Sequence, residues 1–161
     1  INTYALPLLL TNCTNNYGPN QYEEKLIPKT IKSIMKGDKI TIYGKGDNIR
    51  DWIYVDDHCD ALIKIIESEN MHNRYNIGSQ NEVDNLSIVK MICNKLSKLE
   101  ISLPKDPLSL ISFVDDRLGH DKRYSIDNTR ITEEYKWQPT TSFDNGIDKT
   151  IEYYVKSLLY K

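Results

Sequence analysis

The sequence contains little cysteine, and its few cysteines follow no pattern of a metal site or a disulfide framework. There are three in 161 residues, Cys13, Cys59 and Cys93, with no CxxC pair and no Cys/His spacing. We therefore expect neither disulfide bridges nor a zinc site. This cysteine usage predicts a reducing compartment, and we expect the cytoplasm.

Long apolar runs and an excess of basic charge are also missing. The longest apolar run is far shorter than the roughly 20 residues that span a bilayer, so we predict no membrane insertion. Lysine and arginine number 21 against 23 aspartate and glutamate residues, which gives a formal net charge of −2. Surfaces that bind nucleic acid are strongly basic, so we expect no nucleic-acid partner.

The familiar catalytic signatures are absent. There is no GxGxxG and no GxSxG, and the sequence Gly44-Lys45-Gly46 lacks the spacing of a phosphate-binding loop. We interpret residues 44–48 as a hairpin turn. The histidines, at positions 58, 72 and 120, have no metal-ligand spacing, so we predict no metal site. We expect His58, at the start of a predicted helix, to be structural and His72 to be solvated.

The beginning of the chain has neither an initiator methionine nor a signal-peptide pattern. An apolar run at residues 6–10 ends at Thr11 and is typical of a buried strand in a parallel sheet. Because a natural chain rarely begins directly on a central strand, we expect residue 1 to be a cut.

The rest of the chain alternates between strand and helix patterns. Helical spacing of apolar residues predicts helices over residues 24–36, 56–68, 87–99, 127–135 and 142–158, with Gly37, Asp56 or Asp57, Asp127 and Ser142 at their ends. Short apolar runs predict strands over residues 40–43, 50–55, 75–78 and 111–114, and polar composition predicts loops over 12–24, 102–110 and 116–124. This alternation predicts the α/β class.

Two cationic features are candidates for an anion site. Arg50 opens a predicted strand, and a partly buried arginine needs an anionic partner, which Asp51 or a ligand phosphate could supply. The loop at residues 115–124 is dense in charge of both signs. Its composition favours a solvated loop. The alternative is an anion site in which Arg117 and Arg123 present planar guanidinium groups to a diphosphate.

Four segments together resemble one family. They are residues 11–19 (TNCTNNYGP), 24–28 (EKLIP), 42–58 (IYGKGDNIRDWIYVDDH) and 116–127 (DRLGHDKRYSID). In this order they resemble the C-terminal half of the nucleotide-sugar 4,6-dehydratases, of the dTDP-glucose type with UDP-glucose relatives. These enzymes are extended short-chain dehydrogenase/reductases, and the resemblance covers nearly the whole chain.

The resemblance implies an architecture in two parts. The chain would be the α/β C-terminal part of a Rossmann-like enzyme, the last strand or strands of its sheet plus the small substrate-binding domain. Residues 1–161 would be the substrate-binding portion, with residues 1–12 at the edge of the Rossmann sheet. The N-terminal NAD-binding portion would precede residue 1, and the full-length enzyme would be a homodimer.

The resemblance also implies an activity. Such enzymes are NAD-dependent lyases that convert NDP-glucose to NDP-4-keto-6-deoxyglucose plus water, in deoxysugar and rhamnose biosynthesis. NAD takes a hydride from sugar C4 while the tyrosine of a YxxxK pair removes the hydroxyl proton, and an Asp/Glu pair eliminates water. Every one of these catalytic groups would precede residue 1. The resemblance therefore implies no catalytic residue in this chain, which would be inactive alone.

Matched position by position, the resemblance assigns binding roles. Asn16 would contact NAD, and the substrate contacts would be Asn15, Lys25, Leu26, Thr41, Ile42, Tyr43, Arg50, Asn85, Asp116, Arg117, Gly119 and His120. Lys25 would lie near phosphate, residues 41–43 would flank the base, and Arg50 would clamp the diphosphate. The family often has proline where Thr41 and Leu118 stand here.

Two other functions remain open at this point. A related nucleotide-sugar epimerase or decarboxylase shares the superfamily, although residues 24–28 and 116–127 favour the dehydratase. A non-catalytic nucleotide-sugar-binding module would also lack the catalytic groups.

Overall fold

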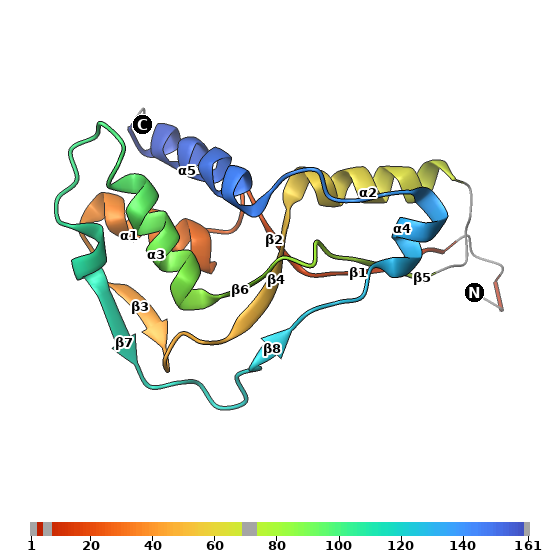
Figure 1. Ribbon diagram of the computed structural model, residues 1–161, viewed down its shortest axis with the longest axis horizontal. Helices are drawn as coiled ribbons and strands as arrows, with labels where there is room; N and C mark the ends of the chain where they lie inside the picture. Colours follow the sequence, from red (N-terminus) through yellow and green to blue (C-terminus); the bar gives the residue numbers. More distant parts are fainter. Residues whose placement is uncertain (1–2, 5–7, 69–73, 160–161) are drawn as a thin grey trace.

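A computed structural model describes residues 3–4, 8–68 and 74–159 (Figure 1). Its strands are β1 (Leu10–Cys13), β2 (Asn15–Tyr17), β3 (Ile40–Tyr43), β4 (Ile49–Tyr54), β5 (Arg74–Ile77), β6 (Glu82–Asp84), β7 (Ile111–Val114) and β8 (Arg123–Tyr124). Its helices are α1 (Leu26–Lys36), α2 (Val55–Glu67), α3 (Asn85–Leu96), the 3-10 helix η1 (Pro107–Leu110), α4 (Thr129–Tyr135) and α5 (Phe143–Leu159). The predicted α/β class is confirmed. Among the described residues, every helix is too short or too polar to span a bilayer.

The strands form three small groups rather than one wide sheet. β1 pairs with β5 and β3 pairs with β7, both in parallel. β4 is the central strand of the third group: it pairs with β2 and β8 in parallel and with β6 antiparallel. Because parallel pairs need crossover connections, these pairings join segments that are distant in sequence.

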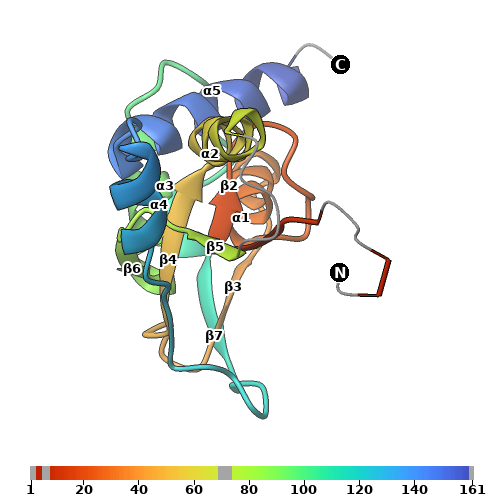
Figure 2. The ribbon, with the colours of Figure 1, turned by 90° about the vertical axis from the view of Figure 1, so that its right-hand side faces the viewer.

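Two separate cores support these strands. The larger contains the buried faces of α1, α3 and α5 with residues of β2, β3 and β4. The smaller lies around α2, α4 and β5 and includes the fully buried Ala61, Ile65, Tyr75 and Trp137. Figure 1 shows α1, α3 and α5 at one end of the molecule and α2 and α4 at the other. In the turned view, α5 and α2 lie above the strands (Figure 2).

The long amphipathic helices lie where the apolar spacing predicts them. α1 buries Ile27, Ile31 and Ile34, and Gly37 ends it in the left-handed conformation with φ of 73°. This conformation suits glycine because it has no Cβ. α3 begins at Asn85, where the carboxylate of Asp84 accepts the backbone N–H of Ser87 and caps the helix.

The predicted hairpin at residues 44–48 is wrong. These residues do form a turn, but β3 pairs with β7 and not with β4. The Gly44 N–H donates to the Val114 carbonyl, which continues the β3–β7 ladder and keeps β3 away from β4. Pairing between distant segments therefore decides the sheet.

The predicted strand at residues 6–10 is also misplaced. The strand begins at Leu10, and the predicted loop at 12–24 contains its end and all of β2. Leu8 and Leu10 are 43% exposed. The reason is that alternate side chains of this segment, among them Leu9 just before β1 and Cys13 at its end, pack against the smaller core. Residues 6 and 7 lie outside the described residues, as does His72.

Three expectations at helix ends or faces need correction. α2 begins after Tyr54, and Asp57 accepts hydrogen bonds from Thr140 and Thr141 instead of capping the helix. The N-cap of α4 is Asn128, not Asp127, although the Asp127 carboxylate accepts the Thr129 N–H. The apolar spacing predicts Ala61, Leu62, Ile65 and Ile66 on one face of α2, but Ile66 is 59% exposed because the smaller core covers only the adjoining face. The predicted loop at 102–110 also contains η1.

Candidate functional site

One cavity of about 520 Å³ lies where β2, β3 and β4 meet the first turns of α1 and α3. Figure 2 shows β2 and β4 side by side, with α1 beside them and the β3–β7 pair below. The cavity is lined by Asn15, Asn16, Gln21, Glu24, Lys25, Leu26, Lys29, Thr41, Tyr43, Arg50, Trp52, Asn85, Arg117 and His120. These residues come from seven segments spread over more than a hundred positions, so the fold brings them together.

Most residues assigned by the resemblance line this cavity, and three do not. Ile42 is 2% exposed and points into the larger core, because it alternates along β3 with the cavity-lining Thr41 and Tyr43. Asp116 does not line the cavity, but its carboxylate forms a hydrogen bond with His120, which does. Gly119 has open space around the position of a Cβ.

Arg50 is buried beside the cavity without an anionic partner among the described residues. It is 8% exposed, and its guanidinium donates to the Ile49 carbonyl at 2.7 Å and to the Asp121 carbonyl at 2.8 Å. Of the two partners offered for Arg50, Asp51 or a ligand phosphate, Asp51 is wrong, because adjacent residues of a strand point to opposite faces. The Asp51 carboxylate instead accepts the Ser79 hydroxyl and the Asn81 N–H, both at 2.9 Å.

The loop after β7 folds back on itself through Asp116. The Asp116 carboxylate accepts the Arg117 N–H at 2.9 Å and bonds to His120 Nδ1 at 2.7 Å. The hydrogen bond from His120 lowers the pKa of Asp116. The same carboxylate packs on the turn at Gly44, where a Cβ would lie 3.0 Å from it. This arrangement presents Arg117 and His120 to the cavity.

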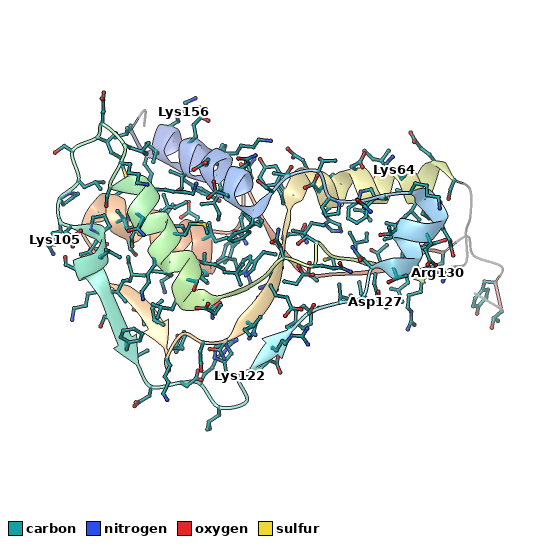
Figure 3. All side chains as sticks on the ribbon, viewed as in Figure 1. Lys64, Lys105, Lys122, Asp127, Arg130 and Lys156 are labelled. Atoms are coloured by element: carbon teal, nitrogen blue, oxygen red, sulfur yellow. The ribbon has the colours of Figure 1, made fainter. Side chains whose placement is uncertain are left out.

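The alternative of one anion site that joins Arg117 and Arg123 is wrong. Arg117 lines the cavity, but Arg123 forms two bonds of 2.7 and 2.5 Å to the Glu82 carboxylate. This ion pair links β8 to β6 across β4, which lies between them, and uses the planar guanidinium for structure. Lys122, at the lower edge of the molecule in Figure 3, pairs with Asp47. The loop is therefore part solvated surface and part cavity wall.

Sequence reasoning missed four residues that line the cavity: Gln21, Glu24, Lys29 and Trp52. Two carried a signal. Lys29 follows Lys25 by one helical turn, and Trp52 follows Arg50 by the period of a strand. Gln21 and Glu24 lie in an irregular loop, where no periodicity indicates a direction. Together the lining side chains offer the cations Lys25, Lys29, Arg50 and Arg117 against the single carboxylate of Glu24.

Three buried polar atoms of the lining residues have no hydrogen-bond partner within the described part of the chain. They are Asn16 Oδ1, Gln21 Oε1 and Trp52 Nε1. Buried polar groups normally find partners, so an unpaired cluster beside a cavity indicates a polar ligand. No group of His, Cys, Asp or Glu suited to a metal occurs among the residues described. The three cysteines are free. The cavity can therefore bind an anion that also carries hydrogen-bonding groups.

Comparison with known proteins gives one consistent family. The family model described as GDP-mannose 4,6 dehydratase matches residues 1–150. A dTDP-glucose 4,6-dehydratase from Shigella flexneri is 45% identical over 153 residues, which are 95% of this chain and 42% of that protein. Another from Salmonella typhimurium is 46% identical, with the same coverage. The chain thus spans less than half the length of the curated relatives it matches.

Solved structures agree with the relatives. The dTDP-glucose 4,6-dehydratase from Bacillus anthracis in complex with NAD is 37% identical with a TM-score of 0.86, covering 99% of this chain and 48% of that chain. The dTDP-glucose 4,6-dehydratase from Streptomyces venezuelae with NAD bound is 33% identical with a TM-score of 0.88, covering 99% and 47%. A UDP-glucose 4-epimerase from Thermotoga maritima, 23% identical with a TM-score of 0.83 over 98% and 48%, shares the fold.

Proposed function

The chain belongs to the GDP-mannose 4,6 dehydratase family, and from this membership we propose that it is the nucleotide-sugar-binding half of an NAD-dependent dTDP-glucose 4,6-dehydratase. The complete enzyme would be a lyase that converts dTDP-glucose to dTDP-4-keto-6-deoxyglucose and water. The relatives that are 45% and 46% identical carry that name, which favours dTDP over other nucleotides.

The observation that carries the proposal is the cationic cavity around Arg50. Lys25, Arg50 and Arg117 come from three different elements and line the same space. A nucleoside diphosphate has two adjacent phosphates, and guanidinium groups bind phosphate oxygens through paired hydrogen bonds. Tyr43, which is 49% exposed beside the cavity, offers an aromatic face to the base.

We assign substrate contacts within this cavity by element. Arg50 and Arg117 would hold the diphosphate, together with Lys25 at the start of α1. Thr41 and Tyr43 would flank the base, and Asn85 and His120 would lie toward the nucleotide. Ile42 would act only through its backbone, because its side chain is in the larger core.

The catalytic groups would lie in an N-terminal NAD-binding half, which makes this chain inactive alone. NAD supplies hydride transfer when it is bound. On this chain, Asn16 fits a cofactor contact, because its Oδ1 is buried and has no partner among the described residues. The chain's own contribution to the reaction is to bind and orient the nucleotide sugar.

The proposed boundary between the halves is supported by uncovered apolar surface. β1 pairs with β5 on one side only, within the described residues. Leu8 and Leu10 are exposed there, and α2 has an outer face of Cys59, Ile63 and Ile66, which we call the α2 stripe. A Rossmann sheet with residues 1–12 at its edge would cover these surfaces.

Two further parts of the proposal rest on other grounds. The homodimer is supported by the resemblance alone. The cytoplasmic location is supported by the three free thiols.

The test uses the full-length enzyme that contains this chain. It is incubated separately with dTDP-glucose, UDP-glucose and GDP-mannose, and the masses of the products are measured by mass spectrometry. We expect the product of dTDP-glucose to be lighter by one water. A product of unchanged mass but altered stereochemistry would identify an epimerase. Binding of dTDP without turnover of any of the three sugars would favour a non-catalytic module.

A further inference from the structure

The loop at residues 18–25 forms one wall of the cavity and has little regular structure of its own. It brings Gln21, Glu24 and Lys25 to the lining. Its internal backbone bonds are few: the Gln21 N–H donates to the Gly18 carbonyl at 3.4 Å, and the Lys25 N–H to the Tyr22 carbonyl at 3.0 Å. Loops without a hydrogen-bond ladder depend on outside contacts for their position.

Two of those outside contacts come from the last helix, more than a hundred residues later. The Tyr154 hydroxyl donates to the Gln21 carbonyl at 2.6 Å, and the Tyr153 hydroxyl donates to Asn20 Oδ1 at 2.5 Å. Tyr154 is 4% exposed. The rings of Tyr153 and Tyr154 pack edge to face, with their centroids 5.2 Å apart. We call this pair the tyrosine clamp. Figure 1 shows α5 along the end of the molecule that holds α1 and α3.

The hydrogen bonds continue from the clamp to the strand beside the cavity. Gln21 Nε2 donates to the Asn16 carbonyl at 2.7 Å, and Asn16 Nδ2 donates to the Thr14 carbonyl at 3.2 Å. Gln21 is therefore fixed at its backbone by α5 and at its side chain by β2. A shift of Tyr154 would move Gln21 and with it the cavity wall.

We propose that Tyr154, with Tyr153, is a positioning residue for the nucleotide sugar. The clamp holds the 18–25 loop so that Gln21 and Lys25 face the cavity, although neither tyrosine lines it. The proposal rests on the proposed function for the identity of the ligand. Its first part, that the clamp fixes the loop, holds independently of any ligand.

The alternative is that the tyrosines only stabilise the fold. The rings contribute to the larger core, so removal of a whole side chain would not distinguish the two roles. Tyr154→Phe keeps the ring and removes only the hydroxyl. The Gln21 carbonyl then loses its partly buried donor, and the loop gains freedom while the core stays filled.

The experiment compares Tyr154→Phe and Tyr153→Phe with a matched control in the full-length enzyme. The control is Tyr135→Phe, which removes a hydroxyl that bonds to Ser68 and Tyr75 near the smaller core. Hydrogen–deuterium exchange is measured without ligand. Titration with dTDP gives the affinity, and turnover of dTDP-glucose gives KM and kcat separately.

We expect Tyr154→Phe to increase hydrogen–deuterium exchange in residues 18–25. The dissociation constant for dTDP and the KM for dTDP-glucose should each rise about three- to ten-fold, as for the loss of one hydrogen bond. The kcat should change less, and Tyr135→Phe should change none of the three. Unchanged exchange in the loop would overturn the clamp. If exchange in the loop rises but dTDP does not bind even to the parent enzyme, the proposed ligand is wrong. The conclusion that the tyrosine clamp fixes the loop would still be supported.

Discussion

Arg50 occupies an unusual position for a cation. It is nearly buried, yet among the described residues it meets two carbonyl oxygens and no carboxylate. A buried charge without a counterion is costly unless hydrogen bonds or a ligand compensate it. The carbonyls orient the guanidinium toward the cavity, and the missing negative charge is what a diphosphate would supply. We therefore expect Arg50 to be the side chain on which dTDP binding depends most.

We expect Arg50→Ala to weaken dTDP binding about ten- to a hundred-fold, since charge-assisted hydrogen bonds contribute about 1.5–3 kcal/mol. Arg50→Lys should bind with intermediate affinity, because an ammonium keeps the charge but not the planar group. Arg123→Ala is the matched control, since its guanidinium pairs with Glu82 away from the cavity. Isothermal titration calorimetry measures all three. An Arg50→Ala variant that binds like the parent would contradict the assignment.

Residue positions could be predicted from sequence wherever a regular period applies. Thr41 and Tyr43 share a face of β3 by alternation, and helix spacing places Lys29 one turn after Lys25. Gln21 could not be found in this way, because its place depends on a hydrogen bond from Tyr154 on a distant helix. The error at Asp51 had a simpler cause: neighbours in a strand face opposite sides.

The last helix is the element that ties the cavity to the rest of the fold. Near its start, Gly146 packs directly on the Tyr17 ring, and the Tyr17 hydroxyl donates to the Phe143 carbonyl at 3.3 Å. A Cβ at position 146 would meet the Tyr17 hydroxyl and lie 2.9 Å from Cζ of its ring. Only glycine allows α5 to approach β2 this closely.

We expect Gly146→Ala to lower the free energy of unfolding by about 1–3 kcal/mol, the usual cost of overpacking a core. Urea unfolding of the full-length enzyme measures it. The double variant Gly146→Ala/Tyr17→Phe should recover part of the loss, because it removes the nearest atom. Additive losses in the double variant would show that the contact does not limit the packing.

Longer elements could be predicted from the sequence better than shorter ones. Helices of eleven residues or more, such as α1, α3 and α5, carry several turns of apolar spacing and lie where the sequence predicts them. β2, β6 and β8 have two or three residues each. So short a strand has no readable period, and it exists because β4 pairs with it.

At the scale of the molecule, the described residues form two cores, and the surface of the smaller one is less completely covered. The larger is enclosed by three helices, whereas the smaller ends at the edge of β1 and at the α2 stripe. Ile63 and Ile66 are 53% and 59% exposed there. Exposed strand edges beside apolar patches favour association with other chains. In the proposed enzyme, the NAD-binding half would cover both.

We expect the 161-residue chain, produced alone, to self-associate through this surface, and to become monodisperse when it is produced with its NAD-binding half. Light scattering after size-exclusion chromatography, at several concentrations, measures the oligomeric state.

The double variant Ile63→Glu/Ile66→Glu should reduce self-association and also weaken assembly with the other half, because a charge on the α2 stripe opposes burial. Lys64→Glu, on the same helix but outside the stripe, is the control (Figure 3). A lone chain that is monomeric and melts cooperatively would show that the smaller core needs no cover, and the proposed boundary between the halves would then be wrong.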